Sequence, residues 1–455
     1  MRVLQVGSRL AYGLVAGFLL CIIWCFEANA QYRSGYSELA DSERTSKFKS
    51  HISFLSSDRL EGRGAGSVGE KEAADYVRGV MEEYGLEILS GNEGDLFGIR
   101  MESGDTLTSR NVVGCIQGYD RDYCGKYIVV GARLDNLGKI TVNVDGEPSL
   151  KYYNGANGNA SGLAMMLELA RLVSTNKVLF RRSVLFVAFG ASTHASAGSW
   201  YFLNRSFKDS ADIEAMINLD MLGTGNSGFY AYTSSNPDMN MILSQVGAEL
   251  QPIVPKLTSE EPYMSDHRSF YAKEIPSVMF TTGRYPEHNT FRDKEEIIEY
   301  GPMERILEYL YNYTRFIANV QNPPLFTQDK SLNITDGKTY TYDECDKRPT
   351  FMGSADPKIF LLKWVYQYLK YPHKAVEQGI QGRVVVGFTV NPDGKVSDVY
   401  VARGADPLLD EEAVKVVAAS PKWKAGTVKG KKVPVTMTVA VDFMLQKKGK
   451  FGIKK

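Results

Sequence analysis

The run KYIVVGARL at residues 126–134 is followed by GLAMMLELARLV at 162–173 and by SVLFVAFG at 183–190. The first and third runs are short, continuous and apolar, which is typical of strands buried on both faces. The middle run has apolar residues at helical spacing, and Ser161 precedes it as the expected N-cap. Strands alternating with a helix in this way predict an α/β fold, with a mostly parallel sheet and helices on both faces.

Neighbouring segments extend this pattern in both directions. Helical spacing runs from Phe48 to Tyr84 and is interrupted by a loop at 61–66. The other expected elements are three strands and a closing helix: NVVGCI (111–116), INLDMLG (217–223), SVMFTTG (277–283) and ERILEYLYNYTRFIANV (304–320). All of these segments would contribute to one large domain.

A second, smaller α+β unit follows a Pro-containing stretch that begins at QNPP (321–324). Its expected elements are IFLLKWVYQYL (359–369) as a helix, RVVVGFTV (383–390) and VSDVYVA (396–402) as strands joined by a turn at 391–394, EEAVKVVAA (411–419) as a helix, and VPVTMTVAVDFML (433–445) as a strand. The sequence therefore predicts a signal peptide (1–30), a large domain (31–320), a linker (321–340), a small domain (341–446) and a basic tail (447–455).

Charge is unevenly distributed along the 455 residues. The whole chain is neutral, but residues 340–455 hold 20 Lys/Arg and only 12 Asp/Glu. A basic small domain is suited to acidic partners. Nucleic acid is not expected as a partner, because the basic residues are not interleaved with aromatic ones.

The N-terminus has the pattern of an export signal. Arg2 and Arg9 precede an apolar run at 11–26, and Ala28-Asn29-Ala30 offers a small-x-small cleavage site. An uncleaved signal anchor is the alternative, and it would be the chain's membrane contact. Either reading places the folded part outside the cytoplasm, in the periplasm or outer cell envelope.

Three cysteines remain after such cleavage. Cys115 and Cys124 flank a polar loop between two apolar segments, so they could form a disulfide in an oxidising compartment or remain as two buried thiols. Cys345 has no evident partner.

Six motifs in order resemble those of the secreted bacterial zinc aminopeptidases, family twenty-eight of the metallopeptidases. The resemblance covers about residues 45–320 and rests on LSSDRLEGRGAGSVGEKEAADYV (55–77), NVVG (111–114), the loops at 131–138 and 155–162, NLDMLG (218–223) and SDHRSFYAKEIPSVMF (265–280). In this family two zinc ions polarise the scissile carbonyl and activate a water, while a glutamate acts as general base.

Most of the residues implied by the resemblance are replaced here. The replacements are Arg133 for the first His, Gly158 for the bridging Asp, Ser192 for the general base, Thr193 for the ligand Glu and Asn289 for the late His. Of the five metal ligands only Asp220 is retained, and Asp135 remains in the first of these loops, at 131–138. One carboxylate cannot hold a zinc pair, and a guanidinium opposes a divalent cation. We therefore expect no bound metal and no catalytic residue.

Arg133 suggests a different role for this site. Without metals, Asp220 and Asp135 would need a counter-ion, and the hypothesis is that Arg133 pairs with one of them in bidentate geometry. An improvised single-metal site would instead use His194 and His288 with Asp220, helped by Asp266 and His267. Ser192 near His194 could be read as a nucleophile pair, although spacing along a loop does not establish contact. The segment 58–64 is expected to shape the first loop, and His267 to be satisfied by local hydrogen bonds.

The small domain resembles the C-terminal domain of TonB and its relatives over about residues 340–446. The matching motifs are Tyr371-Pro372, GIQG (379–382), Asp393-Gly394, Leu409-Asp410, Glu412-Ala413, PKW (421–423) and Gly430-Lys431. The resemblance implies a periplasmic module that binds an extended peptide by adding it to a sheet edge.

These observations together predict an exported envelope protein with a non-catalytic aminopeptidase-like domain and a TonB-like interaction domain. The expected partner is a peptide or protein, such as an outer-membrane receptor. One alternative is an active zinc aminopeptidase with an atypical site. A second is a TonB-like adaptor for outer-membrane transport, although TonB itself uses a lasting anchor and a long Pro-rich spacer.

Overall fold

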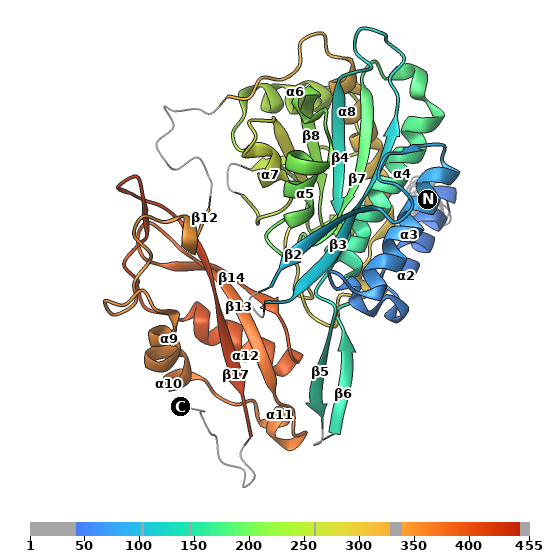
Figure 1. Cartoon of the computed structure of the whole chain (residues 1–455). Coiled ribbons are helices and arrows are strands. Elements are labelled where there is room, and N and C mark those ends of the chain that lie inside the picture. The colour runs from blue at the N-terminus through green and yellow to red at the C-terminus, as the bar shows by residue number, and fades with distance from the viewer. Residues whose placement is uncertain (1–41, 102–103, 145–146, 259–260, 328–338, 446–455) are drawn as a thin grey trace, which may run out of the picture.

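A computed structural model describes residues 42–101, 104–144, 147–258, 261–327 and 339–445 (Figure 1). Within them the chain forms a large α/β unit and a smaller α+β unit, each with its own buried apolar cluster. The expected signal sequence and the basic tail lie outside the described residues. Among the residues that the structure does describe, no helix combines the length and apolar character needed to cross a bilayer.

The large unit contains a nine-stranded sheet in the order β1-β3-β7-β4-β8-β11-β9-β10, with β2 paired to β3. Its strands are β1 (Glu87–Ile88), β2 (Asp95–Arg100), β3 (Thr106–Ile116), β4 (Tyr127–Arg133), β7 (Ser183–Phe189), β8 (Ile213–Leu219), β9 (Tyr230–Tyr232), β10 (Lys256–Thr258) and β11 (Ser277–Thr281). The four central strands β7, β4, β8 and β11 are parallel, whereas β3 and β9 flank them in antiparallel orientation. The predicted α/β fold is confirmed, with antiparallel pairs added toward its edges.

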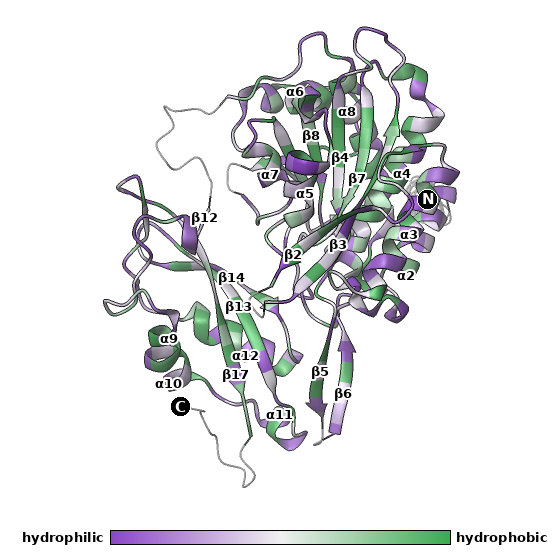
Figure 2. Ribbon diagram, in the orientation of Figure 1, coloured by the Kyte–Doolittle hydropathy of each residue, from purple (hydrophilic) through white to green (hydrophobic). Residues whose placement is uncertain are grey.

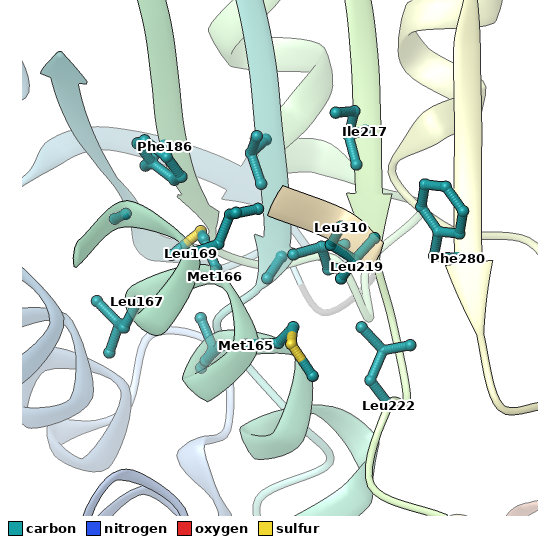
Figure 3. Close-up of a cluster of buried hydrophobic side chains, with 14 of the residues drawn as sticks. Met165, Met166, Leu167, Leu169, Phe186, Ile217, Leu219, Leu222, Phe280 and Leu310 are labelled. Atoms are coloured by element: carbon teal, nitrogen blue, oxygen red, sulfur yellow. The ribbon is translucent and has the colours of Figure 1, made fainter. Parts of the chain in front are cut away.

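Helices cover both faces of this sheet. One face carries α2 (Glu43–Leu55), α3 (Val68–Glu83), α4 (Ser161–Thr175), α6 (Pro237–Ala248) and α8 (Tyr300–Asn319), and the other carries the short helices α5 (Ala197–Tyr201) and α7 (His267–Tyr271). Figure 2 shows that hydrophobic residues concentrate along the central strands. Figure 3 shows side chains of α4, among them Met165 and Leu169, meeting Phe186, Ile217 and Leu310 from the strands and α8. Most of α4 is buried and apolar, and its one buried acid, Glu168, is paired with His51 and Arg171.

The start of α4 differs from the expectation for Ser161. Ser161 is the first residue of the helix rather than its N-cap, and the side chain that accepts from the first turn is that of Asn159, from the Gly162 N–H at 3.2 Å. The Ser161 hydroxyl instead donates to the Asn157 carbonyl at 2.9 Å and accepts from the Leu222 N–H at 3.0 Å. The buried hydroxyl therefore links the loop before α4 to the loop after β8, a partner that local spacing could not reveal.

The smaller unit is a curved sheet in the order β12-β17-β13-β14. Its strands are β12 (Tyr340–Thr341), β13 (Gly382–Val390), β14 (Val396–Arg403) and β17 (Val435–Phe443), with a separate pair of β15 (Thr427–Val428) and β16 (Lys431–Lys432). Its helices are α9 (Pro357–Phe360), α10 (Tyr366–Tyr368), α11 (His373–Glu377) and α12 (Pro407–Ala418). Asp406 caps α12 and Pro407 begins it, a favourable start for a helix. Phe360, Phe388 and Trp423 pack together in its core.

The two units contact each other directly. A hairpin of β5 (Lys139–Val144) and β6 (Glu147–Tyr152) extends beside the smaller unit, where Asn143 forms an isolated bridge with Gln381 (Figure 1). Next to the hairpin, the buried Tyr153 hydroxyl donates to the Gly404 carbonyl. The Gly404 N–H in turn donates to the Asn289 carbonyl at 3.1 Å. The loop after β11 thus lies against the end of β14.

Cys115, Cys124 and Cys345 are free thiols in this structure. Cys115 is buried in β3, and burial, followed by the charge of Glu87, raises the pKa of its thiol to about 12. Of the two possibilities left open by the sequence, the structure therefore contains the thiols.

Candidate functional site

The parallel register brings four strand ends to one edge of the large sheet. Arg133 at the end of β4 pairs with Phe189 of β7, and the preceding residue pairs with Leu219 of β8. Leu219 in turn lies beside Phe280 of β11. The loops that follow these strands therefore meet, as expected for the functional edge of a parallel sheet.

Arg133 and Asp220 lie together at the centre of this edge. Arg133 Nη2 is 3.7 Å from Asp220 Oδ1, which is an ion-pair distance but longer than a hydrogen bond. Asp220 Oδ2 accepts a 2.7 Å hydrogen bond from the Ser265 hydroxyl. Burial opposes the charge of Arg133, but Asp220 and then Asp135 raise the pKa of its guanidinium. Arg133 is therefore near enough to Asp220 to act as its counter-ion, but among the described residues it makes none of the bidentate hydrogen bonds that the hypothesis included.

Asp135 is fully buried and holds the loop after β7. Its Oδ1 accepts from the Ser192 N–H at 2.7 Å, and its Oδ2 accepts from the Thr193 N–H at 3.1 Å and from the Thr193 hydroxyl. Burial raises the pKa of Asp135. Both carboxylate oxygens are therefore already occupied by donors of the chain.

Gly158 lies beside Arg133 and an acid that sequence reasoning did not single out. A Cβ at Gly158 would be 3.2 Å from Asp293 Oδ2 and 3.5 Å from Arg133 Nη2. Asp293 accepts from the N–H groups of Asn157 and Gly158 and, at 2.6 Å, from the Tyr285 hydroxyl. Burial raises the pKa of Asp293. The only signal in the sequence was its position at the end of PEHNTFRD.

Ser192 bonds an acid rather than a histidine. Its hydroxyl donates to Asp266 Oδ2 at 2.7 Å, and Ser199 donates to Asp266 Oδ1 at 2.6 Å. Burial raises the pKa of Asp266 to about 7. His194 instead has its Nδ1 3.1 Å from the Thr193 hydroxyl. The structure therefore contains no Ser192–His194 hydrogen bond among its described contacts.

His267 has the local partner that was expected. Its Nε2 lies 2.9 Å from Glu261, which also pairs with Arg268. Burial opposes the ionised form of Glu261, but hydrogen bonds from Arg268 and then His267 lower its pKa to about 2. His267 thus belongs to a structural ion-pair network.

His288 and Asn289 occupy the loop after β11. The His288 ring lies between Tyr263 and Tyr285, with centroid distances of 6.3 and 5.5 Å. Burial, with the charges of Arg133 and Arg284, lowers the pKa of His288 to about 3, so the imidazole is neutral at ordinary pH. Asn289 adopts a positive φ of 58° and bonds the smaller unit through its carbonyl.

Arg63 fixes the backbone around the first loop. Its fully buried guanidinium donates to the carbonyls of Leu134 at 3.2 Å, Asn154 at 2.8 Å and Gly155 at 3.1 Å. Burial, followed by the charge of Arg133, lowers the pKa of Arg63 to about 10. The segment 58–64 therefore shapes this loop, as the sequence predicted.

These residues do not fit a pair of zinc ions. Within the described residues, no group of three or more His, Cys, Asp or Glu side chains is arranged to hold a metal. A guanidinium lies 3.7 Å from Asp220, and both oxygens of Asp135 are engaged by the chain. Coordination would require donors that this arrangement does not offer.

Comparison with protein-family models defines the class of each unit. Residues 111–314 match the model of peptidase family M28, and residues 367–445 match the model described as the Gram-negative bacterial TonB protein C-terminal. The large unit is therefore similar to peptidase family M28 over residues 111–314, and the smaller unit to the TonB C-terminal family over residues 367–445.

Particular relatives are similar to the large unit. The chain is 25% identical over 232 residues to leupeptin-inactivating enzyme 1 of Streptomyces exfoliatus, covering 50% of this chain and 47% of the relative. It is 28% identical over 233 residues to aminopeptidase YwaD of Bacillus subtilis, covering 48% and 50%. The chain thus spans about half the length of these curated relatives.

Solved structures with a similar fold include two aminopeptidases. The Legionella pneumophila LapA aminopeptidase is 18% identical, with coverage of 64% of this chain and 76% of that one and a TM-score of 0.49. The zinc aminopeptidase BSAP of Bacillus subtilis is 15% identical, with coverage of 62% and 97% and a TM-score of 0.48.

Proposed function

We propose that this chain is an exported envelope protein whose M28 unit binds a ligand without cleaving it and whose TonB-like unit docks a partner. The observation that supports this most directly is Arg133 beside Asp220. A permanent cation 3.7 Å from the one retained acid repels a divalent ion and compensates the acid in its place. Binding at the strand ends then requires no metal.

The TonB-like unit supports the envelope location and the interaction role. Proteins with this domain work in the Gram-negative envelope, and residues 1–30 have the pattern of an export signal. One sheet edge, β14, is contacted by the large unit through Arg284 at Asp398 and Asn289 at Gly404. On the opposite edge, β12 pairs with β17 only at Val435 and Thr436. At the far end of β17 the Asp442 N–H donates to the Tyr366 hydroxyl at 3.2 Å. The part of β17 between these contacts, residues 437–441, is the edge to which we assign an extended peptide partner.

An active metallopeptidase is the second candidate, because curated relatives are named as aminopeptidases. It requires zinc held by groups other than the family's usual set. Zinc content and peptidase activity therefore distinguish the two functions.

The test is made on the purified full chain. The protein is loaded with zinc, desalted and analysed by elemental mass spectrometry, and the same sample is incubated with a mixture of aminoacyl 4-nitroanilides. Aminopeptidase YwaD, treated identically, controls for loading and assay. We expect near-zero zinc and no release of nitroaniline. One or two zinc ions per chain, with activity abolished by Asp220→Ala, would refute the binding function and establish the peptidase.

A further inference from the structure

Three buried nitrogen atoms near the centre of the site have no hydrogen-bond partner within the described part of the chain. They are Arg133 Nε, Arg284 Nε and His288 Nδ1. Asp220 Oδ1, beside Arg133, is an acceptor in the same condition. Buried polar atoms without partners are uncommon in folded proteins, and several at one place indicate a site for a polar ligand.

The two arginines surround the same pair of rings. Both guanidinium charges act on His288, and both act on the Tyr263 hydroxyl. Arg284 lies 6.0 Å from the centroid of Tyr263, and Tyr263 lies 6.3 Å from His288. Arg133 approaches the same rings from the other side: a Cβ at Gly158 would lie 3.5 Å from Arg133 Nη2 and 3.1 Å from the hydroxyl of Tyr285, whose ring lies 5.5 Å from His288. Arg133 and Arg284 therefore border one cluster of rings from two strand ends.

Arg284 lacks an acidic partner within the part of the chain that the structure describes. Arg284 has no carboxylate within ion-pair distance among the described residues, and its contacts are the Asp398 carbonyl at 3.4 Å and the ring of Tyr400 at 3.7 Å. Arg133 has Asp220 at 3.7 Å, while Asp135 is engaged by the loop after β7. Within these residues, Arg133 thus has one acid at ion-pair distance and Arg284 has none.

Arg133 is also within reach of solvent. Its side chain keeps 15% of its exposure, compared with 5% for Asp220. A ligand that enters from solvent therefore contacts the Arg133 guanidinium before it reaches the Asp220 carboxylate. Because guanidinium groups present parallel N–H donors, a planar carboxylate is the anion that they fit best.

We infer that the degenerate metal site of the M28 unit is a carboxylate-binding site, in which Arg133 and Arg284 hold the C-terminal carboxylate of a peptide. Asp220 Oδ1, which has no hydrogen-bond partner among the described residues, accepts a hydrogen bond from the amide N–H of the ligand residue that carries this carboxylate. A phosphate dianion fits less well, since Asp220 would repel its second charge. This inference rests on the proposed binding function and names its ligand class.

The experiment uses thermal shift and calorimetric titration of the full chain in a buffer free of carboxylates. The probe is an equimolar pool of Ala-Xaa dipeptides, so that no side-chain preference is assumed. The same pool with amidated C-termini lacks the negative charge, and a pool of free amino acids tests the smaller source of the same group. Arg133→Gln and Arg284→Gln are compared with Arg348→Gln, which removes an exposed arginine of the smaller unit that pairs with Asp343.

We expect saturable binding of the free-carboxylate dipeptides and at least about 10-fold weaker binding of the amides. Arg133→Gln and Arg284→Gln should each weaken binding about 10-fold, and Arg348→Gln should not change it. Tighter binding of the free amino acids than of the dipeptides would overturn the assignment to a peptide terminus. Equal binding of acids and amides, no binding of either, or unchanged binding by both site variants would overturn the carboxylate site.

The two proposals can fail separately. Absence of carboxylate binding by a zinc-free, inactive chain overturns this inference and leaves the binding function standing. Stoichiometric zinc with peptidase activity overturns the proposed function itself. Arg284→Gln tests the site even where Arg133→Gln disturbs folding, and Tyr400→Ala, which removes the stacking partner of Arg284 but keeps its charge, controls for a displaced loop.

Discussion

Replacing Asp266 by Asn should change how the stability of the large unit depends on pH. Asp266 is fully buried, and its two oxygens accept from Ser192 and Ser199. Burial, together with the charges of Asp135 and Asp220, raises its pKa from 3.8 to about 7. Asn has nearly the same shape and cannot ionise, so the substitution isolates the cost of charging this position.

The sign follows from proton binding in the folded and unfolded states. Between about pH 4 and pH 7 the folded chain keeps the Asp266 proton while the unfolded chain loses it. The free energy of unfolding of the wild type therefore falls as pH rises, by about 1.4 kcal/mol per pH unit from this group. The full shift corresponds to about 4 kcal/mol above pH 7. The free energy of unfolding of Asp266→Asn should lack this slope, so it should rise relative to that of the wild type as pH increases from 5 to 7.

The assay is urea denaturation at pH 5, 6, 7 and 8, read by hydrogen exchange and mass spectrometry in peptides from β4 and β8. This readout keeps the transition of the large unit separate from that of the TonB-like unit. Asp122→Asn, at an exposed acid in a turn, is the matched control, and its free energy of unfolding should depend on pH as that of the wild type does. A constant difference between Asp266→Asn and the wild type across this pH range would refute the reasoning.

Two further substitutions test the fold and the domain contact. Gly62→Ala places a Cβ 2.3 Å from the Gly138 carbonyl oxygen at a φ of +69°, so it should lower the free energy of unfolding by about 2–5 kcal/mol. Gly79→Ala, on the open face of α3, is the control and should raise it by up to about 1 kcal/mol. Equal melting temperatures of the two variants in thermal denaturation would contradict this. Tyr400→Ala removes the ring stacked 3.7 Å from Arg284 and should raise the rate of hydrogen exchange in residues 284–293 about fivefold. Tyr400→Phe keeps the ring and should leave this rate unchanged. An unchanged rate in both variants would show that the contact does not hold the loop.

The main elements of the fold were readable from local pattern. Continuous apolar runs predicted β4 and β7, and helical spacing predicted α4 and α8, because burial on one or both faces imposes a period on neighbouring residues. The family motifs also indicated which residues stand at the strand ends. They placed Arg133 and Gly158 there before any geometry was known, and the replacement of metal ligands by these residues stays a prediction.

Partners of buried polar groups were decided only by tertiary structure. Ser161 bonds the loops before α4 and after β8 instead of capping a helix, and Ser192 bonds Asp266 instead of His194. Asp293 meets Gly158 from a position 135 residues away. The period of a helix or strand depends on adjacent residues, whereas a hydrogen-bond partner depends on which distant loops the sheet brings together.

The contact between the two units also depends on tertiary structure and not on local pattern. Local pattern and motif were enough to predict the two folds and to suggest which residues stand at the strand ends. That Arg284 and Asn289 meet β14 and its end, and that Arg133 lies beside Asp220 at an ion-pair distance, became visible only once the chain was folded. Each unit forms from its own apolar pattern, but the meeting of their surfaces depends on shape and on polar groups that no periodicity records.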